Sequence, residues 1–145
     1  MRKMYFLTIL IIAVMSIGFI YFSNEEEFYA RKFLYTFGIK TEKKATLREN
    51  IIIPESFDKI FEDYNDLQKA SGLDLAEYKG KAAKKLSFRV VNFPDSEETD
   101  VFATVILYNL KPIGGDIKSS KLSGFILPLC AMSELESKAQ DIIKN

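Results

Sequence analysis

The residues with the greatest potential for chemistry include a glycine pair followed by an aspartate. Gly114, Gly115 and Asp116 lie inside a predicted strand, where paired glycines indicate a bulge or a close backbone approach. A bulge there could aim the Asp116 carboxylate at a ligand, with Asn92 or Lys118 nearby. The alternative interpretation is a solvent-facing aspartate beside a bulge that only curves the sheet.

A second candidate group lies on a predicted amphipathic helix. Tyr64 and Gln68 are one helical turn apart, so they could line a cleft between this helix and a sheet, with Asn65 beside them. The alternative is a packed tyrosine whose hydroxyl and neighbouring amide satisfy each other or the backbone. The candidate binding residues are therefore Tyr64, Asn65, Gln68, Asn92, Gly114, Gly115 and Asp116.

Two charged clusters are also candidates for binding. The basic one could meet an anionic wall polymer or lipid headgroups, or could be a solvated strand face; it comprises Lys79, Lys81, Lys84, Lys85 and Arg89. The acidic one could bind calcium weakly but lacks the glycine-punctuated spacing of a calcium loop; it comprises Asp95, Glu97, Glu98 and Asp100.

Composition excludes several classes of chemistry. The chain has no histidine and one cysteine, Cys130, which removes Ser-His-Asp and Cys-His catalysis, most zinc sites and any intramolecular disulfide. Residues 23–145 carry 18 cations and 20 anions, which argues against nucleic-acid binding. We expect neither an enzyme nor a cofactor.

The first 22 residues predict a membrane anchor. Arg2 and Lys3 precede an uncharged, mostly apolar run over residues 4–22, and the next charge is Glu25. About 20 such residues span a bilayer, and the positive-inside rule places the N-terminus in the cytoplasm and residues 23–145 outside. The competing interpretation is a cleaved signal peptide, which would make the domain secreted.

The remaining segments predict the elements that position the candidate residues. We expect a helix that Asn24 caps and Gly38 ends, an edge strand or linker over 39–50, and an amphipathic helix over 54–71 that starts at Pro54. A short turn follows between Asp74 and Gly80, then strands over 84–92, 101–108 and 113–119. The apolar segment 122–129 adds a short strand or packs beneath the sheet, and a weak helix starts at Ser133. This order predicts an α+β fold in two layers, with helix 54–71 packed on an antiparallel β-meander.

Several short phrases resemble a known family. Residues 64–68 (YNDLQ), 72–75 (GLDL), 78–81 (YKGK), 92–94 (NFP), 113–117 (IGGDI) and 124–125 (GF) are similar to the domain of unknown function family 4830. The resemblance covers about residues 33–129. It implies a bacterial protein with an N-terminal membrane segment or signal and no assigned activity. A family tryptophan and a family cysteine are replaced here by Ile39 and Lys118, so any role of that cysteine is not carried over.

These observations favour a membrane-anchored, extracytoplasmic, non-catalytic binding or interaction domain. Its partner would be another envelope protein or a wall component. One alternative is a carboxylate-dependent hydrolase of envelope glycans, which needs two carboxyl groups about 5–10 Å apart. Another is a regulatory or inhibitory domain for an envelope protease or sensor, which an exposed edge strand would favour.

Overall fold

A single long helix forms the N-terminal quarter of the chain. The computed structural model describes residues 2–93, 100–120 and 124–135, without the side chains of residues 2–4, 6 and 19–24. Helix α1 (Arg2–Tyr35) runs through Asn24 without a break, so the predicted cap at Asn24 is wrong; no glycine or proline interrupts residues 19–35. Gly38 ends the helix as predicted, with φ 77° and an Ile39 N–H that donates to the Leu34 carbonyl at 3.2 Å. Among the described residues, no helix is both long enough and apolar enough to cross a membrane.

Within the described residues, five strands form one antiparallel meander, which confirms the predicted α+β class. The strands are β1 (Leu47–Ile52), β2 (Ala82–Arg89), β3 (Val101–Tyr108), β4 (Lys111–Ser119) and β5 (Ile126–Leu127), and they are neighbours in chain order. The β3–β4 turn is shorter than predicted, because Asn109 (φ 49°) and Leu110 (φ 63°) suffice for a two-residue hairpin. Strand β5 is short, and residues 122 and 123 of the predicted segment lie outside the described residues.

Helix α2 (Lys59–Ala70) starts five residues later than predicted. Ile53 exchanges backbone hydrogen bonds with Lys81 and Gly80 at 2.9 and 2.8 Å, so the chain is still extended immediately before Pro54. The cap is Asp58, whose carboxylate accepts from the Phe61 N–H at 2.8 Å. The short 3₁₀ helix η1 (Leu75–Tyr78) lies where a turn was predicted.

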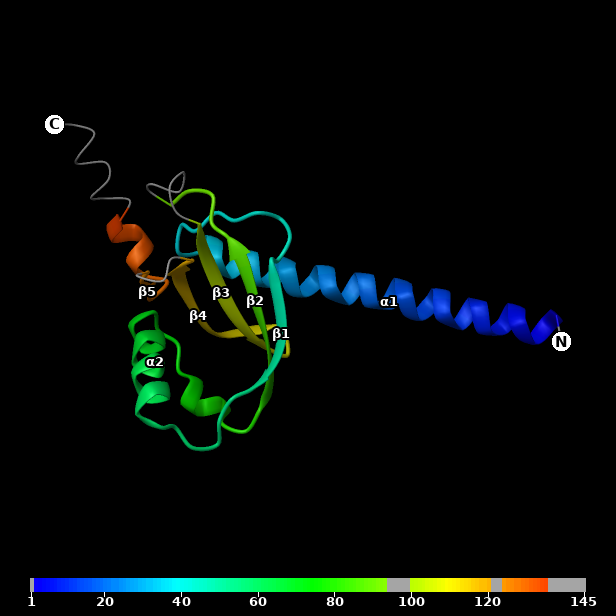
Figure 1. Cartoon of the computed structure of the whole chain (residues 1–145), viewed down its shortest axis with the longest axis horizontal. Helices are drawn as coiled ribbons and strands as arrows, with labels where there is room; N and C mark the ends of the chain where they lie inside the picture. Colours follow the sequence, from blue (N-terminus) through cyan, green and yellow to red (C-terminus); the bar gives the residue numbers. More distant parts are fainter. Residues whose placement is uncertain (1, 94–99, 121–123, 136–145) are drawn as a thin grey trace.

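Helices pack against both faces of the sheet, which corrects the predicted two-layer arrangement. The C-terminal part of α1 buries Ala30 and Leu34 in a core that includes Val105, and the helix contacts β3 and β4. By the alternation of a strand, Ile106 points to the other face, where α2 and η1 form a second core. Figure 1 shows α1 leaving the domain on one side, with α2 beyond β4 on the other. The helical turn at 131–135 closes the described chain; residues 136–145 of the predicted last helix lie outside the described residues.

Candidate functional site

Helix α2 brings two predicted site residues to strand β4. The Tyr64 hydroxyl donates to Asp116 Oδ2 at 2.8 Å, and Gln68 Oε1 accepts from the Gly115 N–H at 2.6 Å. Strand β5 pairs only with Ile117 and Lys118. Gln68 therefore accepts the hydrogen bond of a β4 residue, Gly115, that has no partner in β5. The predicted spacing of Tyr64 and Gln68 thus places both side chains at the glycine–aspartate segment.

The two glycines let other groups approach the β4 backbone closely. A Cβ on Gly115 would lie 2.6 Å from the Thr104 carbonyl oxygen and 2.8 Å from Leu129 Cδ1. A Cβ on Gly114 would lie 3.0 Å from Leu75 Cδ2 and 3.4 Å from Gln68 Oε1. The register shifts by one residue next to Gly114, so the predicted bulge and the predicted close approach are both present.

Asp116 is a buried carboxylate that lacks part of its usual hydrogen bonding. Its exposed fraction is 4%, and Oδ1 has no partner among the described residues, while Oδ2 accepts from Tyr64. Burial raises the pKa of Asp116 above its ordinary value, although the Tyr64 hydrogen bond and the charges of Lys118 and Lys85 oppose this rise. Burial and the Asp116 charge also raise the pKa of Tyr64, so the hydroxyl keeps its proton and acts as a donor.

The amide of Gln68 is the second group with unused hydrogen-bonding capacity. Gln68 is fully buried, and its Nε2 has no partner among the described residues. Together, Asp116 Oδ1 can accept and Gln68 Nε2 can donate one or more hydrogen bonds. A buried water, which usually makes about three hydrogen bonds, could satisfy either atom.

The other two predicted site residues have structural contacts elsewhere. Asn65 donates to Asp74 Oδ1 at 2.8 Å and accepts from the Leu75 N–H at 2.8 Å, which ties α2 to η1. Asn92 donates to the Gly38 carbonyl and accepts from the Lys40 N–H, both at 2.8 Å. The structure therefore places Tyr64, Gln68, Gly114, Gly115 and Asp116 together and places Asn65 and Asn92 apart from them.

A buried polar pair behind Asp116 was not predicted. Thr104 faces Asp116 across the β3–β4 register, and its hydroxyl lies 3.1 Å from the Ser87 hydroxyl. Both residues are buried. The sequence signal was the interruption of the apolar run over 101–108 by one threonine.

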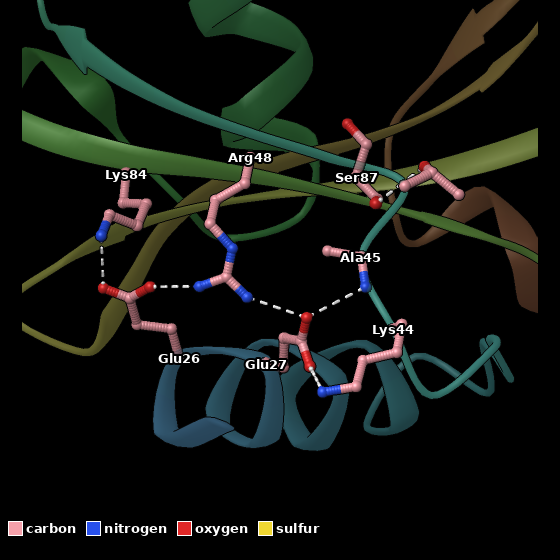
Figure 2. A network of polar contacts seen from close by, with 8 residues as sticks. Glu26, Glu27, Lys44, Ala45, Arg48, Lys84 and Ser87 are labelled. Carbon is pink, nitrogen blue, oxygen red and sulfur yellow. Dashed lines mark hydrogen bonds and ion pairs between the residues drawn. The ribbon is translucent and has the colours of Figure 1, made fainter. Parts of the chain in front are cut away.

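A second buried network joins α1 to the sheet and was also not predicted. Glu26 and Glu27 are buried, and both accept from Arg48 of β1, at 2.9 and 2.8 Å (Figure 2). Glu26 also pairs with Lys84 of β2 at 2.7 Å, and Glu27 accepts from the Ala45 N–H at 3.2 Å. Two carboxylates this buried require such partners, because a buried charge is unfavourable without pairing.

The predicted basic cluster is largely neutralised in the structure. Lys84 pairs with Glu26, Lys85 with Glu49 at 3.3 Å, and Arg89 with Asp100 at 2.6 Å. Residues 95–98 of the predicted acidic loop lie outside the described residues. These contacts favour the solvated, paired interpretation of the basic cluster over a binding face.

Together, these features define a small α+β domain with one antiparallel sheet, docked on an N-terminal helix and carrying a buried tyrosine–aspartate–glutamine site. Residues 31–117 match the family described as a domain of unknown function, DUF4830, and the chain belongs to that family. The matched range includes all five residues that the structure brings together at β4. No curated protein and no solved structure matches the chain.

Proposed function

We propose that this protein is a membrane-anchored, extracytoplasmic, non-catalytic binding domain of the bacterial cell envelope. Its N-terminus would lie in the cytoplasm, and its partner would be another envelope protein or a wall component. The observation that carries the proposal is the continuity of α1, which joins the apolar N-terminal run to the folded domain without a break.

The described side chains in the first half of α1 support an anchor. Residues 7–18 are all exposed, including Ile9, Val14, Met15 and Ile17, each more than half exposed. These four lie on different sides of the helix, because successive residues turn about 100°. A helix that is apolar all round suits lipid rather than water.

The second half of α1 supports a domain held close to that anchor. Glu26 and Glu27 are buried against Arg48, and Ala30 and Leu34 enter the main core. Glu26 follows residue 22 by four positions, or about 6 Å along the helix axis. The domain would therefore sit next to the bilayer instead of on a flexible tether.

The described carboxylates give little support to the hydrolase alternative. Glu26 and Glu27 are neutralised by cations, and the charged groups that act on Asp116 are Lys118 and Lys85. A glycosidase needs one carboxyl group as acid and a second as base or nucleophile. The contacts of Asp116 suit recognition of a polar group better than proton transfer with a second acid.

A regulatory or inhibitory role is a second candidate, favoured by β1. This strand pairs with β2 and with no other strand of the described sheet, so one edge is open to an extended peptide. Ile52, at its end, is 72% exposed.

Site-specific photo-cross-linking in living cells tests the proposed function. A photoreactive residue would replace Ile52 on the β1 edge, Ile60 on α2 or Tyr35 on α1, which are 72%, 80% and 68% exposed. We expect one envelope protein or wall fragment to cross-link at one of these positions. Cross-links only to cytoplasmic proteins, or none at any position in a correctly localised chain, would contradict the proposal. The intact mass of the purified protein would show whether residues 1–22 remain.

A further inference from the structure

A cleft of about 360 Å³ lies beside the C-terminal end of α1. Its lining comes from α1 and from the segment that follows Gly38: Phe28, Arg31, Lys32, Tyr35, Ile39, Lys40 and Thr41. None of these residues belongs to the Tyr64–Asp116 site.

Both walls of the cleft are held in place by the fold. The four α1 residues follow a spacing of three and four, so they share one side of the helix, while Ala30 and Leu34 are buried in the core. Ile39 is buried. The opposite wall is fixed because Asn92 Oδ1 accepts from the Lys40 N–H at 2.8 Å and Thr41 bridges to Val90.

The charged residues that the structure describes along the cleft have one sign. Arg31, Lys32 and Lys40 are cations, and no carboxylate among the described residues lines the cleft. In the part of the chain that the structure describes, none of the three forms an ion pair, in contrast to Lys84, Lys85 and Arg89. Cations that converge on one concavity raise the local concentration of anions.

Arg31 is the cleft cation best suited to bind an anion. Its Nε is buried and makes no hydrogen bond within the described residues, so other atoms of the side chain line the cleft. A guanidinium presents its donors in a fixed fork that matches phosphate oxygens. Phe28 and Tyr35 are 58% and 68% exposed at the same cleft, so they can cover the organic part of a ligand.

We propose that this cleft binds a phosphate group, with Arg31 as its hydrogen-bonding residue and Lys32 and Lys40 as its counter-charges. Arg31 follows residue 22 by nine positions, or about 13 Å along the helix, whereas the headgroup layer is about 5–8 Å thick. On the proposed membrane placement, on which this step alone rests, the Arg31 backbone lies just beyond the headgroup layer, and its side chain tilts back toward that layer because helical side chains point toward the helix N-terminus. A lipid headgroup and a soluble phosphodiester share the recognised chemistry.

The test follows the side-chain Nε–H resonances of the full chain by NMR. The chain has four arginines, so Arg31 can be assigned with the Arg31→Lys variant. In nanodiscs of a lipid whose headgroup carries no phosphate, we expect inorganic phosphate or glycerophosphoglycerol to shift the Arg31 resonance saturably and leave the Arg48 resonance in place. Arg31→Gln should weaken binding at least about tenfold, because a charge-assisted hydrogen bond is lost. Lys40→Gln should weaken it severalfold, and the control Lys59→Gln, on exposed α2, should not.

A second arm uses nanodiscs that contain phosphatidylglycerol and no added phosphate. A shift of Arg31 in this arm alone would identify the headgroup as the source, and a shift in the first arm alone a soluble phosphodiester. The proposal would be overturned if the Arg31 resonance shifts in neither arm. It would also be overturned if the backbone signals next to Lys32 report the same affinity in Arg31→Gln and Lys40→Gln as in the unmodified chain. The first arm does not depend on which side of a membrane the domain occupies, so its failure is distinct from failure of the proposed function.

Discussion

Replacing Tyr64 by phenylalanine tests the buried site at one hydrogen bond. The hydroxyl donates to Asp116 Oδ2 at 2.8 Å, and Oδ1 has no partner among the described residues. The variant therefore leaves a 4%-exposed carboxylate without its donor. A hydrogen bond to a charged group contributes about 1.5–3 kcal/mol, so we expect the free energy of unfolding to fall by that amount at neutral pH.

The effect should depend on pH with a defined sign. Burial already raises the pKa of Asp116 in the folded state, so the stability that this residue contributes is greatest at acid pH and is lost as pH rises through the folded-state pKa. The Tyr64 hydrogen bond lowers that pKa, and the variant should raise it further. Each additional pKa unit at Asp116 corresponds to about 1.4 kcal/mol of lost stability at neutral pH. This loss disappears at pH values where Asp116 is protonated in both proteins.

The assay is urea unfolding of the full chain in detergent micelles, followed by far-ultraviolet circular dichroism from pH 4 to pH 8. The matched control is Tyr35→Phe, on an exposed ring, for which we expect a change within about 0.5 kcal/mol at every pH. A destabilisation by Tyr64→Phe that is equal at pH 4 and pH 8, or no larger than that of the control, would refute the reasoning.

Three further substitutions test the packing and the charge network by the same unfolding assay. Gly115→Ala should destabilise the fold by about 1–3 kcal/mol, because its Cβ would meet the β3 backbone at 2.6 Å. The control Gly18→Ala should not, because a Cβ there has nothing within 4 Å. Equal effects of the two substitutions would contradict the close approach at Gly115. Arg48→Met should destabilise by about 3–5 kcal/mol, because it removes a shared partner of two buried glutamates, and a loss below about 1 kcal/mol would show that they are solvated. Asp58→Ala should remove the α2 cap and about 1 kcal/mol, and an unchanged stability would mean that the helix starts elsewhere.

Local signals in the sequence were sufficient for the central strands and for the end of α1. The apolar run over 101–108 is β3 as predicted. The alternation around Leu86 and Phe88 locates β2, although both faces of this strand carry buried residues, Leu86 and Phe88 on one and Ala83 and Ser87 on the other. Gly38 ends α1 as predicted because a positive φ at a helix end is decided by nearby residues.

Pairing between distant residues explains the errors in the fold. Helix α2 starts late because Ile53 pairs with Gly80 and Lys81, which no local pattern near Pro54 reveals. Asn24 is a possible cap by residue type, but the helix continues because Glu26, Glu27 and Ala30 are buried against the sheet. The division of the chain at residue 22 stays a prediction, and α1 crosses that point.

The candidate site was predictable only in its parts. Helical spacing placed Tyr64 and Gln68 on one face, and the glycine pair predicted a close backbone approach. The two groups meet only because α2 packs against β4, and 52 residues separate Tyr64 from Asp116. Asn65 and Asn92 have suitable side chains, yet the fold uses both for backbone contacts. Acidic and basic residues are usually exposed, so composition alone gave no reason to expect a buried glutamate pair.

The location of the domain is the central claim, and labelling in intact cells measures it most directly. On a Cys130→Ser background, Lys59→Cys places one thiol on the exposed start of α2. We predict that a membrane-impermeant maleimide labels this thiol in intact cells, or in spheroplasts if an outer barrier blocks the reagent, as fully as it does after lysis. Labelling that appears only after lysis would place the domain in the cytoplasm and contradict the account.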